Sequence, residues 1–307
     1  MNTDILPTED PAAHPSGTAR ERLLLLMVGN RPTEAVTRWF HDRARRRPLH
    51  VEVLAAIEDA RASRTRRDAL KALAEQGVES ARERLVADSD SIEVSTRIVW
   101  DRPDDAVADA IGAASAIVIG VPDVEDWIAE RVAFRVASEA VAPVVIVPDS
   151  WTARPGPVVV GVQPEEGLDD AAIDFAARES LADPAGLRIV SSWQLPILLA
   201  YDTYEPSIVD ELTESAVNTV REATERARRT VGPDRLIRQT VVERDPVDAL
   251  RSEAADARML VVGTHGRSAV ARVLLGSVSR QLLRNPPTVL AIVRQRTTSD
   301  APDADAG

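Results

Sequence analysis

Cysteine is absent from this chain of 307 residues, and positive charge is scarce relative to negative charge. Without cysteine the chain has no disulfides, zinc–thiolate sites or thiol nucleophiles, and it suits the reducing cytoplasm, where we expect it. The 37 lysine and arginine residues are outnumbered by 49 aspartate and glutamate residues, which gives a net charge of −12. Because phosphate backbones bind to basic surfaces, nucleic acid is not an expected partner.

Long apolar segments are also missing. The longest apolar runs, such as residues 23–28, are far shorter than the roughly 20 residues that cross a bilayer, so no membrane association is expected. The N-terminus is acidic and has no apolar stretch, which argues against a secretory signal. Residues 1–20 and 297–307 are rich in proline, threonine and acids, and we expect them to be disordered tails.

Short apolar runs alternate with longer helix-patterned segments, and this order occurs twice. The runs are rich in β-branched residues, as in strands buried on both faces of a parallel sheet. We therefore expect an α/β fold of two repeated domains, residues 21–150 and 151–296. Each would be a five-stranded parallel sheet of order 3-2-1-4-5 with helices on both faces. The predicted strands are residues 23–29, 51–56, 92–99, 116–120 and 144–147 in the first half, and 157–162, 187–193, 236–243, 259–263 and 288–293 in the second.

Matching positions in the two halves support a duplication. Gly120 and Gly263 end matching strands, and the helices expected before them, residues 104–114 and 247–257, each follow a proline at the same offset. Residues 149–157 lie between the halves, and their proline and glycine content predicts a linker.

The second half carries a glycine motif at Gly263, Gly266 and Gly276, with Ser277 directly after the last glycine. An apolar strand precedes the motif and a helix-patterned segment follows it. Glycine turns expose backbone N–H groups and a helix start adds partial positive charge, so this arrangement favours phosphate binding. In a 3-2-1-4-5 sheet the ends of strands one and four meet where the strand order reverses, which places Gln163 in the same crevice.

With this motif the chain resembles the universal stress protein family in its tandem two-domain form. The resemblance covers roughly residues 21–296 and includes the helix entry at Asp245 and Pro246 and the closing strand, residues 289–293. It implies a Rossmann-like fold of the adenine nucleotide alpha hydrolase type. It also implies that the second half binds ATP, together with Mg²⁺ or Mn²⁺.

The same resemblance implies which residues contact the nucleotide. The ends of strands one, two and four would form the adenine and ribose side, and the glycine turn and the following helix start would form the phosphate side. The implied residues are Val162, Gln163, Ser192, Val262 and Gly263 on the first side, and His265, Gly266, Gly276, Ser277, Val278 and Ser279 on the second.

Both halves depart from the family pattern. After strand one, ATP-binding members usually have an aspartate and, two residues later, a serine, whereas this chain has Gln163 and Glu165. Gln163 retains hydrogen-bonding groups but lacks the charge, and Glu165 would repel phosphates if it pointed inward. In the first half the motif positions fall on Asp123, Ala133 and Phe134. An acid and an alanine replace the second and third glycines and a phenylalanine replaces the serine, so we expect no nucleotide in that half.

No catalytic constellation is visible in the sequence. A nucleophile beside a base is missing, as is the lysine-containing Gly-x4-Gly-Lys phosphate loop. His265 has no partner histidine or paired carboxylates at catalytic spacing, so positioning or simple exposure is favoured over catalysis. Arg267 and Arg272 are either phosphate contacts or solvated side chains. We assign no catalytic residue and no protein metal ligand.

The expected function is that of an ATP-binding stress-response regulator or binding module with an unidentified protein partner. Two alternatives stay open: a nucleotide-free structural or interaction protein, and a slow ATPase, autophosphorylating protein or other nucleotide-dependent enzyme. Related ligases and pyrophosphatases carry a serine- and glycine-rich phosphate loop after strand one. Here residues 163–167 contain glutamine, proline and two glutamates, which argues against those enzymes.

The fifth strands of the two halves, residues 144–147 and 288–293, are predicted sheet edges that are apolar and β-branched. Exposed edges of this kind invite uncontrolled pairing. Single-domain members of the family pair through their fifth strands, so the resemblance implies that these two strands pair inside the chain as an intramolecular pseudo-dimer. A homodimer of the whole chain stays open.

Overall fold

The structure is a computed structural model that describes residues 20–28, 32–57, 64–87, 89–100, 114–122, 127–164, 169–195, 206–264 and 275–295. The two predicted tails lie outside these residues, except for Arg20. Its Nε lies 3.3 Å from the Glu93 carboxylate, and its Nη1 donates to the Ser91 carbonyl oxygen at 3.3 Å. These contacts join Arg20 to Glu93 of the strand Ile92–Trp100 and to the residue just before that strand.

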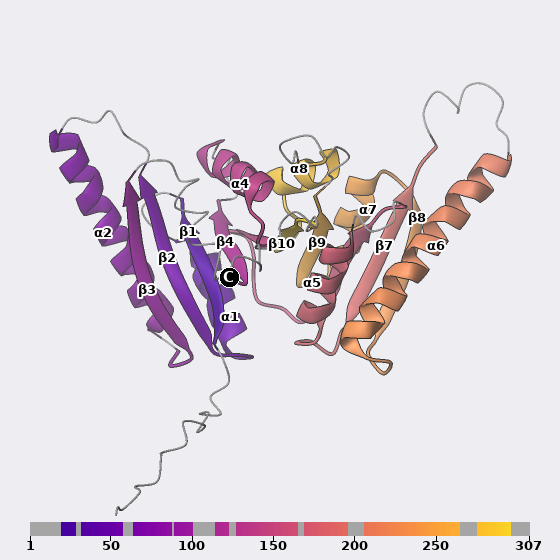
Figure 1. The fold of residues 1–307 in the computed structure, drawn as a ribbon, viewed down its shortest axis with the longest axis horizontal. Coiled ribbons are helices and arrows are strands. Elements are labelled where there is room, and N and C mark those ends of the chain that lie inside the picture. Colours follow the sequence, from indigo (N-terminus) through magenta and orange to yellow (C-terminus); the bar gives the residue numbers. More distant parts are fainter. Residues whose placement is uncertain are drawn as a thin grey trace, which may run out of the picture.

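The chain forms one ten-stranded sheet with the order β3-β2-β1-β4-β5-β10-β9-β6-β7-β8 (Figure 1). Within each half the order is 3-2-1-4-5 and the paired strands are parallel, as predicted. The first half contains β1 (Glu21–Met27), β2 (Leu49–Ile57), β3 (Ile92–Trp100), β4 (Ala116–Val121) and β5 (Val144–Pro148). The second contains β6 (Val158–Val162), β7 (Leu187–Trp193), β8 (Ile237–Glu243), β9 (Met259–Gly263) and β10 (Leu290–Val293).

Helices cover both faces of this sheet and make two hydrophobic cores. Successive strand residues alternate between the cores: Leu23 and Leu25 belong to one, and Leu24 and Leu26 to the other. This is why the central strands are apolar throughout. One face carries α1 (Glu34–Ala44), α2 (Arg64–Val86), α5 (Asp170–Ser180) and α6 (Pro206–Val231); the other carries α4 (Trp127–Glu139), α7 (Pro246–Glu253) and α8 (Ser277–Arg284).

Helix α7 is shorter than the segment 247–257 predicted from the sequence. Asp245 caps its start by accepting a hydrogen bond from the Val247 N–H at 2.9 Å, and Pro246 opens the helix. After Glu253 the chain tightens into turns, because the Ala257 N–H bonds the Ala254 carbonyl at 3.1 Å. The matching first-half helix, predicted for residues 104–114, lies outside the described residues except for its last position.

The two halves join through their fifth strands, as predicted. β10 pairs with β5 in antiparallel fashion, with Leu290 opposite Ile146 and Ile292 opposite Val144. The side chains of these residues are buried. The pairing turns two parallel five-stranded sheets into one continuous sheet and leaves β3 and β8 as its edges.

Separating the halves should expose the β10 edge. We expect a fragment of residues 155–296 to self-associate at micromolar concentration, because an apolar β-branched edge without its partner pairs with another copy. Light scattering on the fragment and on the full chain would test this. A fragment that stays strictly monomeric would contradict the prediction.

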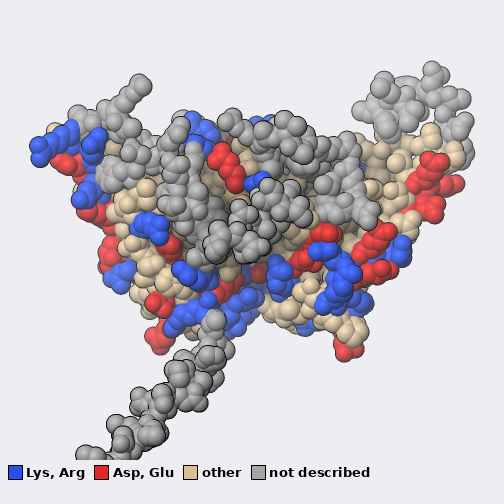
Figure 2. All heavy atoms as spheres, viewed as in Figure 1, with Lys and Arg blue, Asp and Glu red and all other residues tan. Residues whose placement is uncertain are grey.

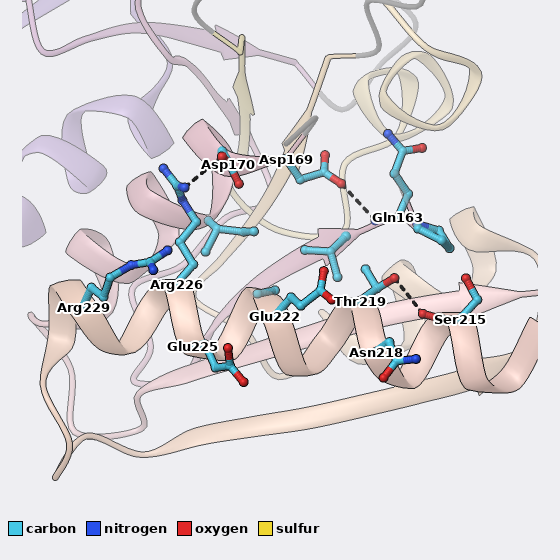
Figure 3. Close-up of a pocket in the computed structure, with 14 residues that line it drawn as sticks. Gln163, Asp169, Asp170, Ser215, Asn218, Thr219, Glu222, Glu225, Arg226 and Arg229 are labelled. Atoms are coloured by element: carbon cyan, nitrogen blue, oxygen red, sulfur yellow. Dashed lines mark hydrogen bonds and ion pairs between the residues drawn. The ribbon is translucent and has the colours of Figure 1, made fainter. Parts of the chain in front are cut away.

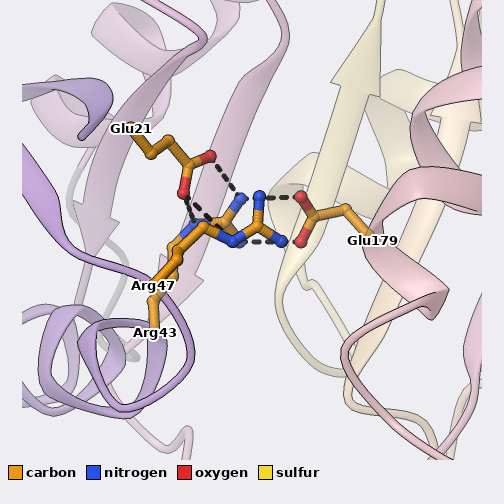
Figure 4. Close-up of polar contacts among 4 residues, drawn as sticks. All are labelled: Glu21, Arg43, Arg47 and Glu179. Atoms are coloured by element: carbon orange, nitrogen blue, oxygen red, sulfur yellow. Dashed lines mark hydrogen bonds and ion pairs between the residues drawn. The ribbon is translucent and has the colours of Figure 1, made fainter. Parts of the chain in front are cut away.

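A buried ion-pair cluster also joins the halves (Figure 4). Arg43, at the end of α1, donates to the Glu179 carboxylate of α5 at 2.7 and 2.6 Å and to Glu21 of β1 at 2.8 and 2.6 Å. Arg47 Nε lies 3.6 Å from Glu21. Burial alone would lower the pKa of Arg43, but its interactions with Glu179 and Glu21 outweigh burial, so the pKa is raised. Burial alone would raise the pKa of Glu179, but attraction to Arg43 outweighs this and the pKa is lowered.

Candidate functional site

The candidate site lies where β6 and β9 end side by side. Val158 pairs with Met259 and Val160 with Val261, and β7 flanks β6 on its other side, so the strand order reverses at this point. A cavity of about 90 Å³ opens at these strand ends. It is lined by Gly161, Val162, Gln163, Asp169, Val190, Ser192, Pro246, Leu250, Val262, Gly263, Val278 and Ser279.

Seven of the eleven predicted nucleotide residues line this one cavity. They come from the ends of β6, β7 and β9 and from the first turn of α8: Val162, Gln163, Ser192, Val262, Gly263, Val278 and Ser279. Gly276 and Ser277 do not line it, but they directly precede Val278 at the start of α8. His265 and Gly266 lie outside the described residues, as do Glu165, Arg267 and Arg272.

The start of α8 offers hydrogen-bond donors to an anion. Gly276 is the N-cap, with φ −60° and ψ 164°, and it provides no side-chain cap. The Arg280 N–H bonds the Gly276 carbonyl at 3.0 Å, and the Ser279 hydroxyl donates to the same oxygen at 3.1 Å. The backbone N–H groups before Arg280 have no partner within the helix, as at any helix start. Such groups, together with the helix dipole, favour a phosphate.

Asp169 brings a carboxylate into the cavity that the sequence did not predict. It lies at the N-cap position of α5, is 8% exposed and accepts a hydrogen bond from the Gln163 N–H at 2.9 Å through Oδ2. The chain has Gln163 where ATP-binding family members usually have an aspartate, but Asp169, six residues later, brings a carboxylate to the same cavity. The sequence signal for this helix start was the pair Asp169 and Asp170 directly before a helix pattern, because acids are common at helix N-termini.

Gly161, Val190, Pro246 and Leu250 were also missed. A Cβ on Gly161 would lie 2.9 Å from both Leu250 methyl carbons, so the glycine lets α7 pack closely on β6. Glycine inside an apolar strand was the signal for this close approach. These residues give the cavity apolar walls around its few polar groups.

A larger hollow of about 660 Å³ lies between α5 and α6 and shares Val162, Gln163 and Asp169 with the cavity (Figure 3). Its walls carry more acids than bases, with Asp170, Glu222 and Glu225 beside Arg226 and Arg229. Arg226 is already paired, at 2.8 Å with Asp170 and 2.6 Å with Asp174. Because its acids outnumber its bases, this larger hollow suits phosphates less well than the start of α8 does.

The first half has a different structure at the matching place. Helix α4 begins at Trp127, so Ala133 and Phe134 lie inside the helix rather than at its start. Ala133 is fully buried. A Cβ on Gly120 would lie 2.6 Å from Val36 Cγ2, so the end of β4 is closely covered by α1. Asp123 lies outside the described residues. The positions that match the start of α8 are therefore inside a helix in the first half.

In the described parts of the chain, no group of three or more histidine, aspartate or glutamate side chains is placed to hold a metal ion. Figure 2 shows basic and acidic side chains interspersed over the visible face. Of the helices within the described ranges, none has both the length and the apolar character to cross a bilayer.

Residues 156–294 match the model of the universal stress protein family. A universal stress protein of Mycolicibacterium smegmatis is 38% identical over 64 residues, which are 21% of this chain and 22% of that protein. One of Mycobacterium bovis is 37% identical over 76 residues, which are 24% of this chain and 26% of that protein. The chain thus aligns with about a quarter of the length of these relatives.

The fold has known counterparts over most of the chain. A crystal structure of a universal stress protein from Archaeoglobus fulgidus matches 90% of this chain and 98% of its own, with a TM-score of 0.63 and 16% identity. At this identity the match shows the fold alone. The family match places a universal stress protein family domain in the second half of the chain.

Proposed function

We propose that the chain is a tandem universal stress protein of the cytoplasm whose second half binds one ATP molecule. The first half would carry no nucleotide, and the protein would act as a stress-response regulator or binding module. The observation that carries this proposal is the cavity at the ends of β6 and β9, which adjoins the uncapped start of α8. It lies within the residues that match the family model.

The residues present fit an adenine nucleotide. Val162, Val190, Val262 and Leu250 offer apolar walls for the base, and the start of α8 offers backbone donors for the phosphates. Gln163 has no carboxylate to accept a hydrogen bond from a ribose hydroxyl, and Asp169 offers one instead. A bound divalent cation would neutralise phosphate charge. Because the described residues form no metal-binding cluster of three carboxylate or histidine groups, Mg²⁺ or Mn²⁺ would enter with the phosphates.

Mass spectrometry of the natively purified and then denatured protein tests the proposal directly. Calorimetric titration of the full chain with ATP, AMP and cAMP, each with and without Mg²⁺, should then give one site per chain and a preference for ATP. ATP and AMP share adenine and an unmodified ribose, so the difference between them reports the phosphate side alone, whereas cAMP also lacks a free ribose 3′-hydroxyl. Two equivalent sites would contradict the inactive first half, and no binding would favour a structural interaction protein. ADP formed during incubation would favour a slow ATPase.

Replacing Asp169 with asparagine should weaken ATP binding roughly tenfold or more. Asparagine keeps an oxygen for the Gln163 N–H but loses the charge, and a hydrogen bond to a charged group is worth about 1.5–3 kcal/mol. The measurement is the Kd for ATP and for 2′,3′-dideoxy-ATP in both proteins.

The dideoxy ligand provides the control for this prediction. It should bind the wild type and Asp169→Asn equally, because it has no ribose hydroxyl to lose. An equal loss for both ligands would show that Asp169 acts through the shape of the cavity rather than on the ribose.

A further inference from the structure

Helix α8, whose first turn belongs to the candidate site, contacts helix α4 of the first half (Figure 1). The Arg280 guanidinium lies over the Phe134 ring, 4.7 Å from its centroid. One turn further along α8 and one turn earlier in α4, Arg284 Nε donates to Glu130 Oε1 at 2.8 Å. The two halves are thus connected by a ring contact beside the site and an ion pair farther from it.

The ring contact lies nearer to the first turn of α8 than the ion pair does. Among the described residues no carboxylate pairs with Arg280, so Phe134 is what holds its guanidinium. A cation over an aromatic face is attracted by the negative face of the ring. The Arg284–Glu130 pair has side chains that are 65% and 44% exposed, and exposed pairs contribute little.

This contact acts on the turn that carries the proposed phosphate donors. Arg280 directly follows Ser279, which is buried and lines the cavity, and its N–H bonds the carbonyl of the N-cap Gly276. Phe134 and Val278 pack against the same hydrophobic core. A helix as short as α8 is marginal by itself, so packing from outside decides how well its first turn is ordered.

We propose that Phe134 is a positioning residue for the nucleotide site of the other half. Through Arg280 its ring orders the first turn of α8, so that the backbone donors keep the geometry that phosphates require. Phe134 occupies the place of the motif serine in the first half. The first half, which lacks a phosphate-binding helix start, therefore supports the helix start of the second half. This inference rests on the proposed function and adds a role for the first half.

Nucleotide titrations of the full chain test the proposal with Phe134→Leu, Arg280→Met and the double variant. Each single change should weaken ATP–Mg²⁺ binding roughly two- to fivefold, and the double variant should bind no more weakly than either, because one interaction is removed. Phe134→Trp keeps a ring face and should keep wild-type affinity. Arg284→Gln, which breaks the neighbouring ion pair, is the matched control and should leave affinity unchanged.

Hydrogen exchange in the ligand-free chain gives a readout that does not require nucleotide. The amide at position 280 should exchange faster in Phe134→Leu and Arg280→Met than in the wild type or Arg284→Gln. Unchanged exchange in Phe134→Leu, or additive effects of the two changes on affinity, would overturn the proposal. If the wild type binds no nucleotide, the proposed function is wrong, and the exchange data alone decide whether Phe134 positions α8.

Discussion

Replacement of Arg43 by methionine should lower the free energy of unfolding of the full chain by about 3–5 kcal/mol at pH 7. The change leaves the buried carboxylate of Glu179 without its hydrogen-bonded cation and leaves Glu21 with only Arg47, at 3.6 Å. Removing one member of a buried ion pair typically costs this much. The side chains of Glu21 and Glu179 are only 11% and 5% exposed, so water cannot replace Arg43. Urea denaturation followed by circular dichroism measures the loss.

Arg226→Met is the matched control for this experiment. Arg226 also bridges two carboxylates, but its side chain is 27% exposed and those of Asp170 and Asp174 are 35% and 30% exposed. Its replacement should cost about 1 kcal/mol or less. Combining Arg43→Met with Glu21→Met and Glu179→Met should restore much of the stability, since neither carboxylate is then buried without its cation. Equal losses of unfolding free energy for Arg43→Met and Arg226→Met would show that burial does not set the strength of the buried ion-pair cluster.

The same cluster predicts a dependence of stability on pH. The pKa of Glu179 is lower in the folded chain than its ordinary value of 4.5. Its contribution to stability is therefore complete above pH 4.5 and is lost as the pH falls through the folded-state value. Between pH 5 and pH 3 the wild type should lose stability more steeply than Glu179→Gln. Parallel pH profiles of the urea midpoint for the two proteins would contradict this.

The strands were predictable because their signal is local. β9 begins and ends where its apolar run does, since both faces of this strand are buried. The end of α7 was not predictable, because it depends on hydrogen-bonded turns that lead into β9. The pairing of β5 with β10 followed from family resemblance and the cost of an open edge. The Arg43–Glu179 contact joins residues 136 positions apart and exists only once the halves are placed together.

The candidate site was predictable to the extent that it is built from strand ends. Parallel strands one and four must end side by side, which brings Val162, Gln163, Val262 and Gly263 together. Asp169 was missed because its place in the cavity depends on how the chain returns from β6 to α5. The sequence showed that Gln163 lacks the charge of the usual aspartate, and the structure places the carboxylate of Asp169, the N-cap of α5, beside the Gln163 N–H.

Replacement of Gly276 by valine should weaken ATP binding at least tenfold while the fold survives. Valine accepts the extended backbone at this position, φ −60° and ψ 164°, but its branched Cβ would stand at the start of α8, where the phosphates need open access to backbone N–H groups. Losing one charge-assisted hydrogen bond alone costs about 1.5–3 kcal/mol. Thr33→Val, which alters the N-cap of α1 in the first half, is the matched control and should leave the Kd unchanged. Calorimetric titration of both variants decides the matter: wild-type affinity in Gly276→Val would mean that the phosphates bind away from α8.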